Sequence, residues 1–175
     1  VSKGFLPYFE ERYPAVPLSL FTNGIDKEFI QASHAHDMKW VPKSIINVLY
    51  AGNVGEGQGL HKIIPQMADR LKKRICFKVI GGGGLIQKLR DEVAELGLDN
   101  VELVSPMGRE ALIKEYIKAD VLFLHLNDYD AFRKVLPSKL FEYGAMKKPI
   151  LAGISGYSKE FVKSEICDCA VFFPT

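Results

Sequence analysis

The feature that most restricts the fold of this chain is a regular alternation of short apolar runs with segments of helical periodicity. The apolar runs are short and rich in β-branched residues, and they cover residues 45–51, 76–80, 101–104, 121–126, 150–152 and 170–173. Apolar residues at helical spacing occupy the intervals, at residues 60–71, 85–96, 110–117, 139–146 and 159–162. This rhythm is typical of βα units, and runs without polar alternation indicate a parallel sheet covered on both faces. The sequence therefore predicts a doubly wound, Rossmann-like α/β fold that binds its ligand beyond the carboxyl ends of the strands.

The residues before this pattern begins do not follow it. We expect a helix over residues 2–13 and a short strand over 18–22. The polar stretch 34–43 contains Pro42 and the only tryptophan, Trp40, and is typical of a linker or hinge. The chain starts without methionine and ends directly after a strand, so we expect a fragment.

Composition narrows the classes of function. A net charge of +2, with Lys and Arg scattered along the chain, gives no basic footprint for nucleic acid. No apolar run approaches the roughly 20 residues that cross a bilayer, so we expect at most peripheral membrane association. The three cysteines, Cys76, Cys167 and Cys169, indicate a reduced, cytosolic protein rather than a disulfide framework. Neither Cys167-x-Cys169 nor His34-x-His36 has the spacing of a zinc site, and we expect no metal or other cofactor.

Glycine-rich turns follow the first two predicted strands. Four glycines lie between Gly52 and Gly59, where the first predicted helix opens. Glycine lets the backbone approach a ligand closely, and the free amides of a helix N-terminus attract phosphate. The second run, residues 81–84, lies at the same edge of the sheet. A tight strand-to-helix turn is the alternative for the first run, and a loose loop for the second.

A third motif lies at residues 135–144. Pro137 precedes Ser138, a favourable N-cap residue, and an apolar-periodic helix follows. Amides near Ser138 and the charge of Lys139 suit an anion. Glu142, one turn further on, can accept two hydrogen bonds from a ribose diol. The alternative is a capped surface helix in which Glu142 is merely solvated.

Two other patterns suggest different chemistry. Asp128-Tyr129-Asp130 matches the D-x-D pattern that binds a divalent metal in one class of sugar transferase, but three-residue acidic patterns are common. The run from Gly52 to Gly59 also loosely resembles a dinucleotide fingerprint. That interpretation expects an acidic residue at the end of the second strand, where this chain has Ile80 and Gly81. A nicotinamide-dependent nucleotide-sugar epimerase or dehydrogenase is therefore the alternative hypothesis.

Five short motifs, taken in order, resemble one family. They are Asn23-Gly-Ile-Asp26, Gly52 with Gln58-Gly-Leu60, Val79-Ile80 before four glycines, Asn100-Val-Glu-Leu103, and Pro137-Ser-Lys-Leu-Phe-Glu142. The combination resembles the C-terminal domain of retaining GT-B glycosyltransferases (family 4-like, group 1), closest to those that build bacterial O-antigen and capsule. The resemblance covers nearly the whole chain. It implies that residues 1–22 are the tail of an N-terminal acceptor domain, 23–44 an interdomain linker, and 45–175 a donor-binding domain that is incomplete at its C-terminus.

The resemblance also implies a ligand and its contacts. The domain would bind a nucleoside-diphosphate sugar, UDP-linked, and the intact enzyme would transfer the sugar with retention to a polysaccharide or lipid-linked acceptor. Within the implied site, Glu142 would bind the ribose, Ser138 and Lys139 the diphosphate, and residues 105–107 the base. The implied donor-binding residues are Gly52, Asn53, Gly55, Gln58, Gly81, Ser105, Pro106, Met107, Pro137, Ser138, Lys139 and Glu142.

The chain departs from the family at three positions. Many members carry Arg and Lys in the first loop, where this chain has Asn53 and Gln58, and a glutamate where it has Lys134. We therefore expect Arg133, Lys134 and Lys139 to supply cationic charge, with Arg133 and Lys134 as the candidates for a catalytic role. The fragment alone should bind donor without catalysing transfer. We expect a cytoplasmic protein, at the inner face of the plasma membrane when intact. A non-catalytic sugar-nucleotide-binding protein is a further alternative.

Overall fold

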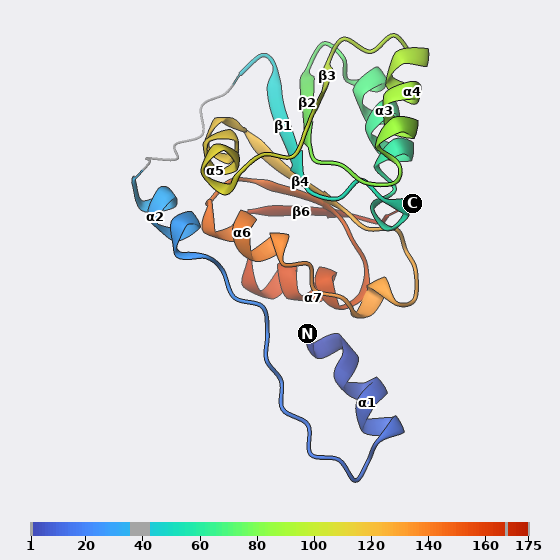
Figure 1. Cartoon of the computed structure of the whole chain (residues 1–175), viewed down its shortest axis with the longest axis vertical. Coiled ribbons are helices and arrows are strands. Elements are labelled where there is room, and N and C mark those ends of the chain that lie inside the picture. Colours follow the sequence, from blue (N-terminus) through green and yellow to red (C-terminus); the bar gives the residue numbers. More distant parts are fainter. Residues whose placement is uncertain (1, 36–42, 167, 175) are drawn as a thin grey trace.

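A single parallel sheet forms the centre of the structure. A computed structural model describes residues 2–35, 43–166 and 168–174 of the chain, and its six strands lie in the order β3-β2-β1-β4-β5-β6 (Figure 1). The strands are β1 (Ile46–Ala51), β2 (Ile75–Ile80), β3 (Val101–Val104), β4 (Val121–His125), β5 (Ile150–Gly153) and β6 (Cys169–Phe172). All five neighbouring pairs are parallel. Every strand starts and ends within one residue of its apolar run, which confirms the predicted doubly wound fold.

Helices cover both faces of the sheet and give it two cores (Figure 1). On one face lie α3 (Leu60–Arg70) and α4 (Ile86–Glu95), whose inward side chains include Leu60, Ile64 and Leu89. On the other face lie α5 (Arg109–Lys118), α6 (Lys139–Ala145) and α7 (Gly156–Glu165), which contribute side chains such as Tyr116, Leu140 and Val162. The central strands β1, β4 and β5 bury most of their side chains under this double cover, which explains their largely apolar sequences.

The N-terminal segment differs in part from its prediction. The predicted helix is present as η1 (Lys3–Phe5) and α1 (Leu6–Arg12), and α1 lies outside the two layers (Figure 1). The predicted strand over 18–22 is wrong, because these residues join no ladder of the sheet. An apolar run becomes a strand only where a neighbouring strand can take up its amides and carbonyls.

Part of the predicted linker is integral to the domain. Residues 27–35 form α2 (Lys27–Ala35), and Phe29 on this helix is only 2% exposed. The Phe29 ring lies 5.9 Å from the ring of Tyr116 on α5. Trp40 and Pro42 lie outside the described residues, as do His36 and Cys167, so the structure adds nothing on the hinge or on the two short His and Cys patterns. The domain boundaries at 22 and 44 stay predictions.

A buried carboxylate anchors the start of β1. Asp120, 8% exposed, accepts a hydrogen bond from Lys43 Nζ at 2.5 Å and another from the Asn47 amide at 2.9 Å. Burial raises the pKa of Asp120, but the Lys43 ammonium and the Asn47 amide oppose it, and the net pKa is lowered. The folded state therefore favours the ionised form.

We expect Asp120→Asn to lower the free energy of unfolding by about 1–2 kcal/mol at neutral pH, between the values for an exposed ion pair and a charged hydrogen bond. Because the folded pKa is below its ordinary value of 3.8, this contribution is complete above pH 3.8 and is lost as the pH falls through the folded pKa. Urea unfolding of both proteins between neutral and acid pH measures the difference. A gap that persists unchanged in acid would contradict the proposed linkage.

Candidate functional site

The main cleft opens where the strand order reverses. Doubly wound sheets bind ligands beyond the carboxyl ends of the two strands at which the chain changes direction, here β1 and β4. A cleft of about 600 Å³ lies at this edge. Its lining comes from the ends of β1 and β2, the loops after β1, β2 and β3, and the helices α5 and α6. The lining residues are Ala51, Gly52, Asn53, Ile80, Gly81, Gly82, Gly83, Pro106, Met107, Leu112, Tyr116, Lys139 and Glu142.

The two glycine-rich loops form one floor of this cleft. The Val54 amide donates to the Gly82 carbonyl at 2.7 Å, and the Leu85 amide donates to the Val54 carbonyl at 2.9 Å. Beneath them the buried Tyr50 hydroxyl donates to the Asn53 carbonyl at 2.7 Å. At Gly52 the backbone has a φ of 148°, which side chains rarely tolerate, and a Cβ there would collide with the Lys139 ammonium. Glycine at this position thus lets a cation rest on the loop backbone.

Lys139 is a cation without an anionic partner. Within the described part of the chain, no carboxylate forms an ion pair with its ammonium and no acceptor hydrogen-bonds to it. Burial lowers the pKa of Lys139, and the nearby Glu142 carboxylate only partly offsets this effect. Lys139 is half-buried. Removing an ammonium from water without a partner is costly, and an anion in the cleft would relieve that cost.

A hydrogen bond from a tyrosine on α5 orients the carboxylate of Glu142. The hydroxyl of Tyr116, which is fully buried, donates to Glu142 Oε2 at 3.1 Å. Burial raises the pKa of Tyr116, so it is a permanent donor at neutral pH. An ionised carboxylate has about four acceptor positions, and the tyrosine occupies only one of them. Glu142 can therefore accept further hydrogen bonds from a ligand in the cleft.

The structure brings together only part of the predicted donor site. Seven of the predicted residues line the cleft, namely Gly52, Asn53, Gly81, Pro106, Met107, Lys139 and Glu142. Five do not, namely Gly55, Gln58, Ser105, Pro137 and Ser138. Ser138 occupies the N-cap position with helical φ and ψ angles of −58° and −29°, and its side chain caps no amide. The extended conformation of a capping serine is absent there.

Sequence reasoning missed the contribution of α5. Leu112 and Tyr116 reach the cleft because α5 crosses from β3 back to β4 over the carboxyl end of β1. Neither residue belongs to a motif, so no linear signal marks them.

Arg133 and Lys134, which were predicted to supply charge to the site, make their contacts outside the cleft. Arg133 binds the Asp128 carboxylate through Nε at 2.9 Å and Nη2 at 2.6 Å, and lies 3.3 Å from Asp130. Ser155 Oγ also donates to Asp128, and Arg133 and Ser155 together lower the Asp128 pKa to about 2. The Lys134 ammonium lies over the Tyr8 ring, 5.3 Å from its centroid. Neither cation lines the cleft, which leaves Lys139 as its cationic side chain.

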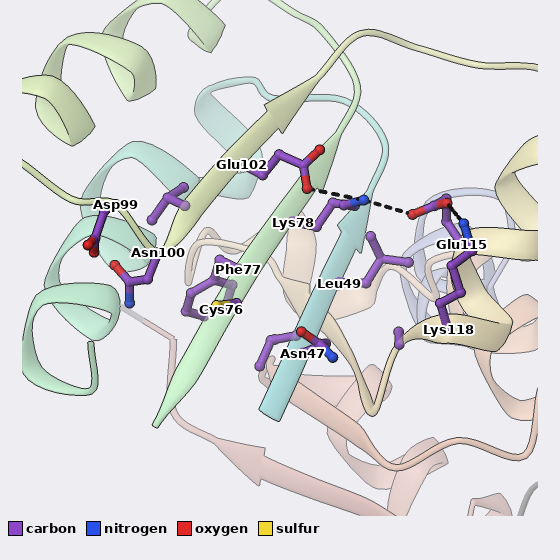
Figure 2. A pocket seen from close by; sticks show the side chains of 13 residues that line it. Asn47, Leu49, Cys76, Phe77, Lys78, Asp99, Asn100, Glu102, Glu115 and Lys118 are labelled. Atoms are coloured by element: carbon purple, nitrogen blue, oxygen red, sulfur yellow. Dashed lines mark hydrogen bonds and ion pairs between the residues drawn. The ribbon is translucent and has the colours of Figure 1, made fainter. Parts of the chain in front are cut away.

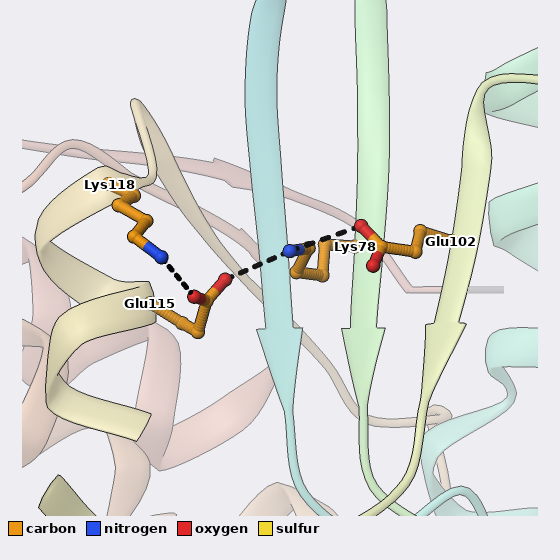
Figure 3. Close-up of polar contacts among 4 residues, drawn as sticks. All are labelled: Lys78, Glu102, Glu115 and Lys118. Atoms are coloured by element: carbon orange, nitrogen blue, oxygen red, sulfur yellow. Dashed lines mark hydrogen bonds and ion pairs between the residues drawn. The ribbon is translucent and has the colours of Figure 1, made fainter. Parts of the chain in front are cut away.

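A second hollow, of about 560 Å³, lies toward the amino ends of β1, β2 and β3 (Figure 2). Here four of the five charged side chains are paired with one another. Lys78 binds Glu115 at 2.9 Å and Glu102 at 3.1 Å, and Glu115 also binds Lys118 at 2.7 Å (Figure 3). The Glu115 contact raises the pKa of Lys78, opposite to the effect at Lys139. Because its two lysines pair with two glutamates and Asp99 adds a further carboxylate, this hollow is the poorer match for an anionic ligand.

The residues that the structure describes also bear on two other kinds of site. No helix there has the length and apolar character to cross a bilayer. The same residues hold no cluster of three or more His, Cys, Asp or Glu placed to share a metal ion.

Comparison with known proteins places the chain in a family. Residues 38–174 match the family model described as glycosyl transferases group 1. WcaI of Escherichia coli K12, named as a colanic acid biosynthesis glycosyl transferase, is 35% identical over 94 residues, which cover 53% of this chain and 23% of WcaI. The chain thus spans about a quarter of this relative.

Solved structures share the fold at low sequence identity. Anabaena HepE in complex with UDP and glucose gives a TM-score of 0.61 at 15% identity, over 75% of this chain and 35% of HepE. The C-terminal domain of LpcC, a group 1 family protein of Francisella tularensis, gives 0.58 at 16% identity, over 74% of this chain and 68% of that one. These are Rossmann-like C-terminal domains of the GT-B architecture. Because the family model matches most of this chain, the chain belongs to the glycosyl transferases group 1 family.

Proposed function

We propose that this domain binds the donor of a glycosyltransferase, a UDP-linked sugar, in the cleft between the glycine loops and α6. The observation that carries the proposal is Lys139, a half-buried cation without an anionic partner, beside Glu142 and against the backbone of Gly52. A diphosphate supplies the anion that this cation lacks, and a ribose diol suits the open acceptor positions of Glu142. Bound UDP in HepE, a structural neighbour, supports this choice of nucleotide.

The chemistry follows from that placement. During transfer, the bond between the anomeric carbon and the β-phosphate oxygen breaks, the acceptor hydroxyl oxygen bonds to that carbon, and the hydroxyl proton is released. Negative charge develops on the departing UDP, and Lys139 is positioned to stabilise it. We propose that transfer proceeds with retention at the anomeric carbon and that the acceptor is a saccharide or lipid-linked saccharide bound by a preceding domain. The name of WcaI, a relative described as a colanic acid biosynthesis glycosyl transferase, supports a role in polysaccharide synthesis. We propose in addition that the intact protein works in the cytoplasm at the inner face of the membrane.

Calorimetric titration of the 175-residue chain with UDP, GDP, ADP and NAD tests the donor site. We expect UDP to bind most tightly and NAD to show no measurable binding, because no acidic side chain follows β2 to accept from an adenosine ribose. Preferential binding of NAD would overturn the proposal. Sugar transfer by the intact gene product, compared with Lys139→Ala in the same protein, separates an enzyme from a non-catalytic binding protein.

A further inference from the structure

A buried histidine lies behind the glycine loop. His125, the last residue of β4, is 0% exposed, and its ring lies against the rings of Phe123 and Phe172, with centroids at 6.4 and 5.8 Å. Its Nδ1 atom is 2.7 Å from the Gln58 carbonyl oxygen. A carbonyl only accepts, so Nδ1 carries the proton and donates. Nε2 is buried without a partner, as expected for a neutral ring in apolar surroundings.

Asn127, two residues after His125, also binds carbonyl groups of the glycine loop. Asn127, 3% exposed, donates from its backbone amide to the Gly57 carbonyl at 2.9 Å and from Nδ2 to the Glu56 carbonyl at 2.6 Å. Three consecutive carbonyls of η2 (Glu56–Gln58) are therefore bound by the residues at the end of β4. The approach is so close that a Cβ on Gly59, where φ is 57°, would lie 2.2 Å from Asn127 Oδ1.

Hydrogen bonds lead from these carbonyls to the cleft. The side chain of Gln58 accepts from the Gly55 amide at 3.2 Å and from Asn53 Nδ2 at 3.0 Å. Asn53 in turn lines the cleft. The conformation of the cleft loop thus depends on where the Gln58 backbone is held, and His125 holds it.

We propose that His125 and Asn127 are positioning residues for the nucleotide site: they hold η2 so that Gln58, which also accepts from the Gly55 amide, keeps Asn53 in the conformation that lines the cleft. This inference rests on the proposed function for its ligand. Neither residue lines the cleft, so both act through Gln58 and the loop backbone. Polar residues directly after a buried strand, at the ligand-binding edge of the sheet, are the sequence signal for this role.

Two substitutions of His125 separate positioning from packing. His125→Phe keeps an aromatic ring against Phe123 and Phe172 but removes the donor. His125→Asn restores an N–H near the position of Nδ1 but loses the ring, so it should lower the unfolding temperature more than His125→Phe does. We expect the order of UDP affinity to be the reverse. His125→Phe should weaken UDP binding about five- to tenfold because the Gln58 carbonyl is left buried and unpaired, while His125→Asn recovers most of the affinity.

Amide hydrogen exchange in the absence of nucleotide gives a second, independent measurement. The amides of Gln58 and Gly59 donate to carbonyls within the loop. We expect their exchange to speed up about tenfold or more in His125→Phe and to return toward the parent rate in His125→Asn. Asn127→Ala, which removes the donor to Glu56, should give the same acceleration if His125→Phe fails to fold.

The outcomes distinguish this inference from the proposed function. If the parent chain does not bind UDP, the donor proposal fails, and loop exchange still tests the positioning role. Unchanged loop exchange in both His125→Phe and Asn127→Ala would overturn it. Affinities that follow the unfolding temperatures of the variants, rather than the presence of the N–H donor, would also overturn it.

Discussion

Replacing Lys139 with alanine should weaken UDP binding about 10- to 100-fold while changing uridine binding little, because a hydrogen bond to a charged group contributes about 1.5–3 kcal/mol. The lost contact is to phosphate, which uridine lacks. Calorimetry with both ligands measures the contrast. The substitution should also flatten the salt dependence of UDP binding, since screening acts on the charge that is removed.

The matched control for this prediction is Lys134→Ala. Lys134 lies in the same stretch of chain, but its ammonium is over the Tyr8 ring and outside the cleft. Its removal should leave UDP affinity unchanged. Equal losses of uridine and UDP affinity in Lys139→Ala would mean that this residue supports the helix or the base, and that the diphosphate has another cationic partner.

Glu142→Ala should show a different pattern, with UDP and uridine weakened by a similar factor of about 10 to 100, the range expected for hydrogen bonds to a charged acceptor. Both ligands contain the ribose diol that Glu142 is proposed to bind. The alanine variant also leaves the buried Tyr116 hydroxyl without its acceptor. Glu142→Gln keeps an oxygen for Tyr116, so calorimetry on both variants separates the ribose contact from the loss of support.

Tyr116→Phe completes this comparison. It leaves the Glu142 carboxylate intact and removes only the hydrogen bond that orients it. A loss of about two- to fivefold for both ligands is expected, as for one neutral donor. Unchanged affinity of a folded Glu142→Ala for uridine, or a loss confined to UDP, would exclude the ribose role.

The sequence was sufficient for the sheet because the signal for a buried parallel strand is local. Each strand coincides with a short, mostly apolar run of the sequence, and the runs match the strands to within one residue. The same criterion fails at residues 18–22, where Leu18, Leu20 and Phe21 are apolar but the segment joins no ladder. Pairing depends on a neighbouring strand, and the run itself contains no information about that neighbour.

The candidate site shows the same limit at the level of single residues. The glycine run from Gly52 to Gly59 was recognisable, but its two halves have different roles. Gly52 admits the Lys139 ammonium, whereas Gly59 admits the Asn127 side chain behind the loop. Both partners come from segments much later in the chain, so only the fold decides which half faces a ligand.

Charge was the property that sequence proximity predicted least well. Arg133 and Lys134 are close to Lys139 along the chain, and the sequence could not separate them from it. In the fold, Arg133 is neutralised by Asp128, which Ser155 also contacts, and Lys134 lies over Tyr8. The sequence by itself determined the layered α/β fold and the edge of the sheet at which the cleft lies. It also identified the glycine loops and the α6 motif at that edge. These features depend on local periodicity and turn chemistry. Only the tertiary structure decided which cation stays unpaired in the cleft, because the energy of a charge depends on its partners and its burial, and both come from distant residues.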